Sequence, residues 1–461
     1  MENAVIGKYL YGKLFEGKET SINIKLKHIE AQNAVLMLDG YKHSMVQIIA
    51  ISIALKSFVR IENVPLVIDT YVLAAIINEL GGEAKILDGQ MILDCRNVCS
   101  ALIPACLGNL IHGSMYLCPA LIVALHEFAF FGSGGCQIGN KLEEYKRPFK
   151  HIISVMAQFG VNIICDHNKV LGSLDKITDE EQIDILRYSD DEHILSGPLV
   201  GGATKTAIIL SLLKNHLIIK NAFIRTETLD MLRFLECFGK KVEISQGTIV
   251  LEGETKIPNQ PVCFKLSQCG SEIVTYSTLS ILTKREVKFA DLNRNVLEKT
   301  LAPEINIFRT MGVSVNWTGN NLIVHPTAPC WHNQPIIVSP QSIQSDHHPF
   351  YTLLFLLGDK KVKITERVWK DRFQYIDNLI KFGAAIYKKN NSIIIYKSEL
   401  RAYDFSLDAL DTRSGAVTLL AMIFTGSHGT LVHSEHILRG YSRLEEHLKK
   451  FGVQIDFSEG K

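Results

Sequence analysis

The chain lacks several features that define common protein classes. Its 461 residues include ten cysteines, but no CxxC pair and no spacing typical of a disulfide framework. The HExxH motif of zinc proteases is missing as well. The formal net charge is only +1, which argues against general nucleic-acid binding and against a polybasic membrane surface. We therefore expect no metal, no cofactor and no nucleic-acid partner.

Long uninterrupted apolar runs are also absent. The most apolar segment, Met115 to Phe131, is interrupted by His126 and Glu127 and is too short to span a bilayer. Residues 1–18 lack the continuous apolar core of a signal peptide. Hydrophobic residues make up 47% of the chain and charged residues 21%, which allows an ordinary globular core. These features predict a soluble cytoplasmic protein without a membrane partner, and they leave its oligomeric state open.

A repeated pattern runs along the chain at intervals of roughly 70 to 80 residues. Helical segments end in a bulky apolar residue and a glycine at Leu80-Gly81, Phe159-Gly160, Phe238-Gly239, Met311-Gly312, Phe382-Gly383 and Phe451-Gly452. Glycine can adopt the left-handed conformation that ends a helix. Alternating segments joined by turn residues such as Asp88-Gly89 follow, which predicts a hairpin after each helix. The last copy, Gly452 to Lys461, is cut short.

Each repeat also contains an earlier and far more apolar helix. These helices are expected at residues 45–55, 115–131, 207–213, 274–282, 350–357 and 416–424. A helix that is apolar on every side is buried. Six such units can bury their apolar faces only by packing on one another, so we predict an α/β fold with three units in each of two lobes and a cleft between the lobes.

Polar residues and arginines mark the ends at which these helices begin. Helices that run side by side direct their partly positive N-termini toward the same place, which favours anions there. Arg147, Arg225, Arg372 and Arg439 stand at the starts of outer helices. The pattern predicts a cleft that holds a small molecule with several negative charges.

A glycine-rich stretch, Gly134-Gly135-Cys136-Gln137-Ile138-Gly139, follows the longest apolar segment and precedes a basic run at residues 141–150. Glycines allow the backbone to approach a ligand closely, and nearby cations favour a thiolate. A lone cysteine in such a turn is more often structural than reactive. The motif points to chemistry only in combination with the rest of the chain.

Two other motifs fail on their spacing. The stretch Gly201 to Thr206 looks faintly like a phosphate-binding loop, but Thr204 stands where the glycine before the lysine is required. His347 and His348 are adjacent, so they do not share a helical face as zinc ligands four residues apart would.

Four stretches of the chain resemble the enolpyruvyl transferases, and among them the branch that acts on UDP-N-acetylglucosamine. They are Asp39-Gly40-Tyr41-Lys42, the glycine-rich stretch around Cys136, Val368 to Phe373, and Arg439-Gly440-Tyr441. The resemblance implies a two-lobed inside-out α/β barrel built from six repeated units, three per lobe. It further implies that residues 1–41 together with 269–461 form the first lobe, and that residues 42–268 form the second.

The implied reaction transfers enolpyruvate from phosphoenolpyruvate to a hydroxyl of UDP-N-acetylglucosamine, a step of peptidoglycan biosynthesis. It passes through a tetrahedral ketal and releases phosphate. Such chemistry needs cations for phosphoenolpyruvate, a base for the attacking hydroxyl and an acid for the methylene carbon. A phosphoenolpyruvate molecule and a nucleotide or nucleotide-sugar acceptor are therefore the expected partners.

The resemblance also assigns roles to residues of this chain. Lys42 matches a lysine that binds phosphoenolpyruvate and takes part in catalysis. Asp346 matches the aspartate near the sugar hydroxyl and is the candidate base, kept ionised by a helix N-terminus. Cys136 matches a cysteine linked to proton delivery, product release and alkylation by fosfomycin. The remaining phosphoenolpyruvate ligands are Arg147, Arg413 and Arg439. The acceptor residues are His43, His112, Arg147, Pro148, Val200, Gly201, Gly202, Asp346, Val368 and Arg372.

Several positions depart from the family pattern. His43 replaces an asparagine, His112 an arginine, and Pro198 a lysine beside the uridine pocket; Gln268 or Cys269 replaces an acidic residue. These changes leave the phosphoenolpyruvate half of the site mostly intact and alter the acceptor half. UMP, as in enolpyruvyl transferases of nucleoside-antibiotic pathways, is therefore an alternative acceptor.

The sequence leaves two further hypotheses about function open. Shikimate 3-phosphate is a less favoured acceptor, because the cysteine motif resembles the nucleotide-sugar branch. A relative that binds nucleotide sugars without catalysis is a third hypothesis, since a shared fold does not guarantee shared chemistry. The presence of Lys42, Asp346 and Arg439 argues against it.

Overall fold

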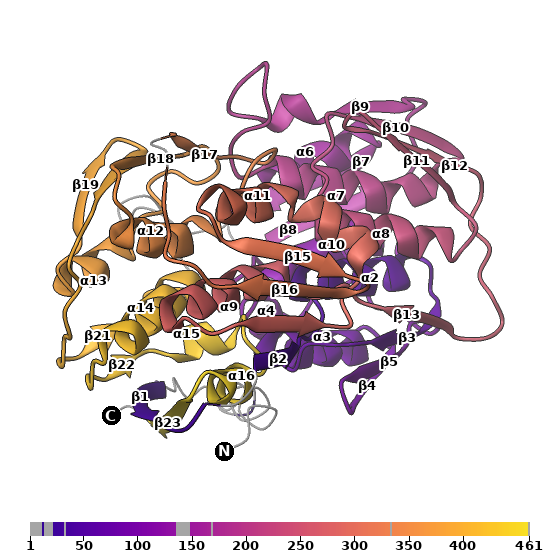
Figure 1. Ribbon diagram of the computed structural model, residues 1–461. Helices are drawn as coiled ribbons and strands as arrows, with labels where there is room; N and C mark the ends of the chain where they lie inside the picture. Colours follow the sequence, from indigo (N-terminus) through magenta and orange to yellow (C-terminus); the bar gives the residue numbers. More distant parts are fainter. Residues whose placement is uncertain are drawn as a thin grey trace.

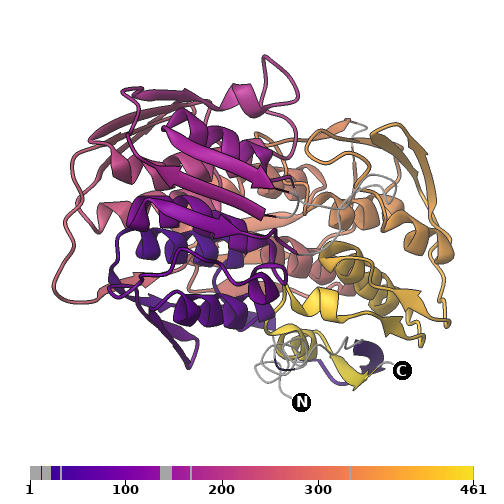
Figure 2. The ribbon, with the colours of Figure 1, turned by 180° about the vertical axis from the view of Figure 1, so that it is seen from behind.

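The structure, a computed structural model, describes residues 22–31, 34–134, 148–166, 169–331 and 334–459, together with Gly12. Helices and strands alternate along these residues, which confirms the predicted α/β class. Apart from the first strands, the early and middle parts of the chain occupy one side of the molecule and the late part the other side, as both views show (Figures 1 and 2).

Six small sheets are found in the described residues, and none of them closes into a barrel. Three of these sheets are built from the chain between Phe58 and Lys265. In spatial order they contain β13 (Val262–Lys265), β3 (Phe58–Glu62), β5 (Gln90–Asp94) and β4 (Glu83–Leu87); then β6 (Glu127–Phe130), β8 (Lys169–Leu174) and β7 (Val161–Asp166); then β11 (Lys241–Ser245), β12 (Thr248–Glu252), β10 (His216–Lys220) and β9 (Gln182–Asp184).

The other three sheets are built from the late part of the chain, and two of them also include one of its first two strands. In spatial order they contain β15 (Ser314–Thr318), β16 (Asn321–His325), β14 (Val287–Ala290) and β2 (Ala34–Met37); then β17 (Ile336–Val338), β18 (Val362–Glu366), β20 (Ser392–Tyr396) and β19 (Ala385–Lys389); then β21 (Leu407–Asp408), β22 (Leu431–Val432), β1 (Ile22–His28) and β23 (Val453–Glu459).

The predicted hairpins are confirmed in five of these sheets, where β4–β5, β7–β8, β11–β12, β15–β16 and β19–β20 pair in antiparallel fashion. Asp88 and Gly89 have φ of 48° and 72°, which suits a two-residue hairpin turn. The shortened last copy obtains its partner differently. Its strand β23 pairs along its whole length with β1 from the other end of the chain (Figure 1). The repeat pattern gave no sign of this pairing.

The outer helices end where the glycines predicted. These helices are α3 (Ile68–Glu79), α6 (Lys150–Gln158), α8 (Thr226–Glu236), α11 (Ala302–Thr310), α13 (Ile376–Lys381) and α16 (Leu444–Lys450). The glycine after each one has a φ between 80° and 95°. An L-residue seldom adopts this conformation, so the glycine is what allows the chain to turn from helix to strand.

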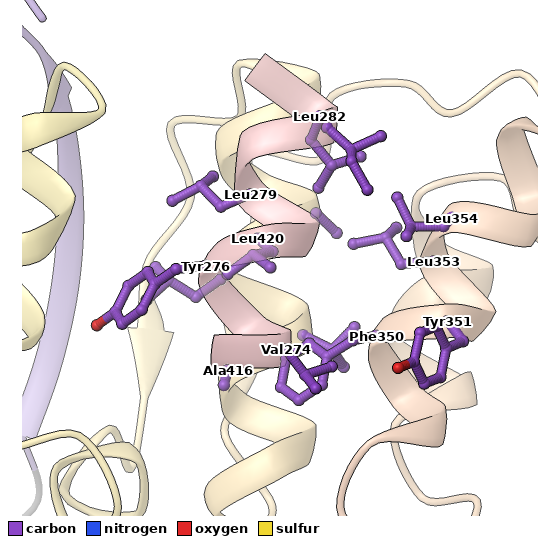
Figure 3. Close-up of a cluster of buried hydrophobic side chains, with 14 of the residues drawn as sticks. Val274, Tyr276, Leu279, Leu282, Phe350, Tyr351, Leu353, Leu354, Ala416 and Leu420 are labelled. Atoms are coloured by element: carbon purple, nitrogen blue, oxygen red, sulfur yellow. The ribbon is translucent and has the colours of Figure 1, made fainter. Parts of the chain in front are cut away.

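The inner helices form two groups of three. Helices α2 (Lys42–Ala54), α5 (Leu117–Leu125) and α7 (Val200–Leu210) contact one another, and so do α9 (Gly270–Thr283), α12 (His348–Leu357) and α14 (Thr412–Thr425). Figure 3 shows the second group, with Val274, Leu353 and Leu420 in the apolar cluster of these helices. These three side chains are at most 1% exposed, as expected for helices that are apolar all round.

One predicted helix is wrong in its extent. The segment Met115 to Phe131 divides into the 3₁₀ helix η1 (His112–Tyr116), helix α5 and strand β6. His126 ends α5 because its backbone turns left-handed, with a φ of 64°. Phe128 and Phe130 then alternate inward along β6. The apolar run alone could not distinguish the end of a buried helix from the start of a strand.

Shorter helices complete the described fold: α4 (Ala105–Gly108), η2 (Ile185–Tyr188), η3 (Ser211–Leu213), α10 (Arg294–Thr300) and α15 (Glu435–Leu438). Buried apolar residues form one core between residues 45 and 266 and a second core from residues 22–38, Ile68 and residues 273–455. The exact boundaries of the two lobes stay a prediction. Among the described residues, none of the helices has the length and apolar character needed to cross a membrane.

Candidate active site

One cleft brings together most of the residues that the sequence nominated. Its walls include Lys42, His43, His112, Val200, Gly201, Gly202, Asp346, Val368, Arg372, Arg413 and Arg439. Helices α2 and α7 begin at the cleft, and α14 contributes its first two residues, Thr412 and Arg413. The predicted convergence of inner-helix N-termini is therefore confirmed for these three helices.

Three residues that the sequence analysis assigned to the site are not found among the residues that line this cleft. Cys136 and Arg147 lie outside the described residues, so their roles stay predictions. Pro148 is described but is not among the residues that line the cleft.

Asp346 lies between two arginines. Arg372 Nη2 is 2.7 Å from Asp346 Oδ1, and Arg413 Nε donates a hydrogen bond of 3.0 Å to Asp346 Oδ2. Burial by itself would raise the pKa of this carboxyl, but the charges of Arg372 and then Arg413 outweigh burial and hold the pKa well below its usual value. The two guanidinium groups therefore favour the predicted ionised state of Asp346.

The predicted place of Asp346 at a helix start is wrong by two residues. Helix α12 begins at His348, and its N-cap is His347 rather than Asp346. After burial, the charges of Arg372 and Arg413 have the largest influence on the pKa of Asp346.

The turn that carries Asp346 is fixed by buried histidines on its C-terminal side. His347 Nδ1 lies 3.0 Å from Glu304 Oε1, and His348 Nε2 lies 3.2 Å from Glu366 Oε2. Each imidazole has its own carboxylate, so both histidines position the turn. Within the part of the chain that the structure describes, the two imidazoles contact different carboxylates.

Arg413 is held in place by its neighbours, and one nitrogen of its guanidinium remains able to donate a hydrogen bond to a ligand. Asp411 caps α14 by accepting hydrogen bonds from the backbone N–H groups of Arg413 and Ser414. The Arg413 guanidinium lies 5.3 Å from the centre of the Tyr441 ring. Within the described residues, its Nη1 atom is buried and has no hydrogen-bond partner. An anion bound in the cleft would accept a hydrogen bond from this Nη1 atom.

A second carboxylate, Asp69, pairs with two further cationic side chains of the cleft. Lys42 Nζ lies 3.5 Å from Asp69 Oδ1, and Arg439 Nη2 lies 3.6 Å from Asp69 Oδ2. Arg439 Nη2 also donates to the backbone oxygen of Leu110 at 3.0 Å. Burial would raise the pKa of Asp69, but Lys42 and then Arg439 lower it. The sequence analysis missed Asp69; the available signal was an acidic residue in the first turn of the largely apolar helix α3.

His43 lines the cleft as a neutral side chain. Burial first, and then the charges of Lys42 and Lys205, lower the pKa of its imidazole to about 3. At neutral pH His43 can therefore accept or donate a hydrogen bond without adding charge. His112 also faces the cleft, and its ring meets that of Tyr116 edge-on, with 6.3 Å between ring centres.

The start of α7 is shaped by close contacts. A Cβ atom on Gly201 would lie 3.3 Å from the ring of Phe223, and one on Gly202 would overlap the imidazole of His151. Gly202 therefore requires glycine for packing, whatever ligand binds there, whereas a side chain at Gly201 would only crowd the ring of Phe223. Val368, across the cleft, is fixed by its backbone N–H, which donates to Glu366 Oε1 at 2.6 Å.

Arg225 joins the two sides of the cleft. It precedes α8, is 4% exposed, and donates to the backbone oxygens of Thr300, Ser339 and Ser342. The sequence analysis had noted it only as one of several arginines at helix starts.

These features can be compared with those of known proteins. A family model described as EPSP synthase (3-phosphoshikimate 1-carboxyvinyltransferase) matches residues 26–448. The chain belongs to this EPSP synthase family. The resemblance noted on four short stretches is thereby confirmed over nearly the whole length, and the chain is an enolpyruvyl transferase by family.

Individual enolpyruvyl transferases are similar to the chain along most of its length. The UDP-N-acetylglucosamine 1-carboxyvinyltransferase 1 of Clostridium acetobutylicum is 26% identical over 447 residues, which cover 94% of this chain and 98% of that protein. The crystal structure of the enolpyruvyl transferase NikO from Streptomyces tendae superposes with a TM-score of 0.85 at 25% identity, covering 96% of this chain and all of the other. EPSP synthase from Acinetobacter baumannii shares the fold, with a TM-score of 0.66 at 14% identity over 95% of this chain and all of the other.

The cleft of this enolpyruvyl transferase includes charged residues that sequence reasoning did not place there. Lys205, Glu227 and Asp411 line it, together with Asp69 and Arg225. The sequence offered one hint for Lys205, a single lysine in the otherwise uncharged segment of α7. Glu227 gave no signal beyond its position near a helix start.

Proposed function

We propose that the chain transfers enolpyruvate from phosphoenolpyruvate to a hydroxyl of UDP-N-acetylglucosamine, with release of phosphate through a tetrahedral ketal. A single observation carries this proposal: Asp346 and its arginines share one cleft with Lys42 and Arg439. The chain would then act in peptidoglycan biosynthesis. We propose further that the six sheets are the outer layers of six units, three per lobe, in an inside-out arrangement.

The charge in the cleft supports binding of phosphoenolpyruvate. Six cationic side chains line the described walls: Lys42, Lys205, Arg225, Arg372, Arg413 and Arg439. Four carboxylates face them: Asp69, Glu227, Asp346 and Asp411. The excess of two positive charges, with the N-termini of α2 and α14 nearby, favours a ligand that carries a phosphate and a carboxylate.

The proposed reaction begins with binding of phosphoenolpyruvate to Lys42, Arg413 and Arg439. While Asp346 is paired with Arg413 it is a weak base, because the pairing lowers its pKa. A substrate anion that attracts the Arg413 guanidinium weakens this pairing and makes Asp346 a stronger base.

Addition and elimination then follow. The acceptor oxygen bonds to carbon 2 of phosphoenolpyruvate and loses its proton to Asp346, while Cys136 gives a proton to the methylene carbon. The ketal collapses when the bond from carbon 2 to the phosphate oxygen breaks: the Cys136 thiolate takes a proton back from the methyl group, and the departing phosphate takes the proton held by Asp346. The products are the enolpyruvyl ether and inorganic phosphate.

The acceptor side supports one alternative. His43 and His112 line the cleft at positions where the resemblance implies an asparagine and an arginine, and Pro198 stands there in place of a lysine. Fewer cations on this side favour a smaller acceptor, of which UMP is the candidate.

Phosphate release distinguishes these acceptors. The protein is mixed with phosphoenolpyruvate and either UDP-N-acetylglucosamine or UMP, and inorganic phosphate is measured over time. Release with UDP-N-acetylglucosamine supports the proposal. Release with UMP but not with UDP-N-acetylglucosamine rejects UDP-N-acetylglucosamine as the acceptor and supports UMP. No release with either nucleotide rejects enolpyruvyl transfer to nucleotides.

Alkylation tests the thiol. The Cys136→Ala variant should no longer be labelled by fosfomycin, whereas Cys106→Ala, which removes an exposed thiol, should be labelled as the wild type is. Labelling that persists in Cys136→Ala shows that another thiol reacts.

A further inference from the structure

Lys205 is an unusual residue for its position. It is the only charged residue of α7, its side chain is 9% exposed, and it lines the cleft. Its Nζ atom lies 3.7 Å from Oε1 of Glu227, at the start of α8, and 4.9 Å from the ring centre of Tyr116, in η1. Three separate elements therefore direct polar or aromatic side chains to one point of the cleft wall.

This buried pair of charges is weak evidence for a stabilising role in the fold. A separation of 3.7 Å is longer than a hydrogen bond, so the attraction is that of an ion pair without tight contact. Burying two such charges removes their hydration, and replacing a buried ion pair by apolar residues often leaves stability unchanged or raises it. A lysine and a glutamate kept at this separation in a cleft wall suit a ligand that completes their hydrogen bonding.

The location favours the acceptor half of the site. Lys205 is four residues after Gly201, so the two residues share a face of α7, and both line the cleft. Lys42 and Lys205 both lower the pKa of the His43 imidazole, and all three side chains line the cleft. After burial, Glu227 and Asp346 are the main causes that raise the pKa of Tyr41. Glu227, Asp346 and Tyr41 also line the same cleft.

We infer that Lys205 and Glu227 bind two adjacent polar groups of the acceptor, beside its attacking hydroxyl. This inference rests on the proposed function and deepens it. The Glu227 carboxylate accepts a hydrogen bond from one hydroxyl, and the Lys205 ammonium donates to the neighbouring oxygen. The acceptor class is a nucleotide or nucleotide sugar whose attacking hydroxyl has a hydrogen-bonding neighbour on the next carbon.

A phosphate group fits this point poorly. Lys205 alone would attract it, but the Glu227 carboxylate close by would repel it. Two adjacent hydroxyls can form hydrogen bonds with both Glu227 and Lys205, because one hydroxyl donates to the carboxylate and the other accepts from the ammonium. The pairing therefore selects neutral oxygens and leaves the charged groups of the substrates to the arginines of the cleft.

Calorimetric titration of the full-length protein tests this inference without requiring turnover. The variants are Lys205→Met and Glu227→Gln, and the control is Lys265→Met, which removes an exposed lysine paired with Asp291 at 2.6 Å. The probes are UDP-N-acetylglucosamine, UMP and phosphoenolpyruvate. We expect Lys205→Met and Glu227→Gln to weaken nucleotide binding roughly 10- to 100-fold, as the loss of a charge-assisted hydrogen bond does. Phosphoenolpyruvate binding should change less than about threefold, and the control should match the wild type.

Deoxy analogues give a second measurement that needs no variant. The wild type should bind 2′-deoxy-UMP, or UDP-N-acetyl-4-deoxyglucosamine, more weakly than the parent nucleotide, and Lys205→Met should bind parent and analogue alike. Equal binding of parent and analogue by the wild type overturns the inference, and so do variants that bind the nucleotide as tightly as the wild type. If neither nucleotide binds to the wild type, the proposed function fails as well, which distinguishes that failure from the first two.

Discussion

Replacing Asp346 by asparagine tests the centre of the proposed site. The change keeps the size of the side chain and removes its charge. Arg372 Nη2 at 2.7 Å and Arg413 Nε at 3.0 Å then face a neutral amide. The variant should lose activity, because an amide cannot accept the proton of the attacking hydroxyl. General bases contribute about 10²- to 10⁴-fold to rates, so kcat should fall by about that factor.

The same substitution should lower the stability of the protein. Hydrogen bonds to charged groups contribute about 1.5–3 kcal/mol each. The amide oxygen of asparagine retains one acceptor, so about one of the two contacts is lost outright. The Asp346 side chain is 26% exposed, which keeps the cost below the 3–5 kcal/mol typical of breaking a fully buried pair. We expect the free energy of unfolding at pH 7 to fall by about 2–3 kcal/mol.

The stability difference should depend on pH in a specific direction. The native pKa of Asp346 lies below its value in the unfolded chain, so the unfolded state binds a proton first as the pH falls. The carboxylate therefore stabilises the native state above about pH 4, and this contribution disappears as the pH falls toward the native pKa. Asp346→Asn lacks the contribution, so its stability should approach that of the wild type below about pH 4.

Urea denaturation from pH 7 to pH 3 and phosphate-release kinetics provide the measurements. Asp359→Asn is a suitable control, because Asp359 is exposed and lies 3.7 Å from exposed Lys360. Such pairs contribute at most about 1 kcal/mol, and this one is remote from the cleft wall. Normal kcat in Asp346→Asn would refute its role as base. A stability loss that stays constant down to pH 3 would refute the assigned ion pairs.

Three further changes probe other parts of the structure. Arg225→Met removes the hydrogen bonds to the backbone oxygens of Ser342 and its neighbours, so urea denaturation should show a loss of about 2 kcal/mol. Gly312→Ala should cost about 1 kcal/mol because φ is 82°, whereas Gly358→Ala, where φ is −73°, should cost little; thermal melting of both variants measures the difference. As the pH falls from 6 to 4, the free energy of unfolding should fall less for His43→Gln than for the wild type. The reason is that burial keeps the His43 pKa near 3 in the native state, whereas the unfolded wild-type chain takes up a proton on this histidine. An equal fall in both proteins would contradict this.

Much of the fold could be predicted because its signals are local. A glycine after a bulky apolar residue ends a helix through its own φ, and all six such glycines behave in this way. Turn pairs such as Asp88-Gly89 set hairpins through the same kind of local geometry. The segment Met115 to Phe131 shows the limit, since buried helix and buried strand have the same apolar composition.

The candidate site was predictable to the extent that it consists of residues in motifs. Lys42, Asp346 and Arg439 lie in or near recognisable stretches, and the structure places them in one cleft. Asp69 and Lys205 belong to no motif. Their presence in the cleft depends on how separate helices pack, which no local pattern records.

The sequence by itself determined the repeated helix–strand units, the helix ends and the supply of cationic groups, because each depends on a few consecutive residues. Only the tertiary structure decided which charges meet: Asp69 with Lys42 and Arg439, Asp346 with Arg372 and Arg413. It also decided that β1 completes the sheet of β23. The physical reason is that burial, ion pairing and the resulting pKa values arise between side chains that are distant in sequence, after the units have packed.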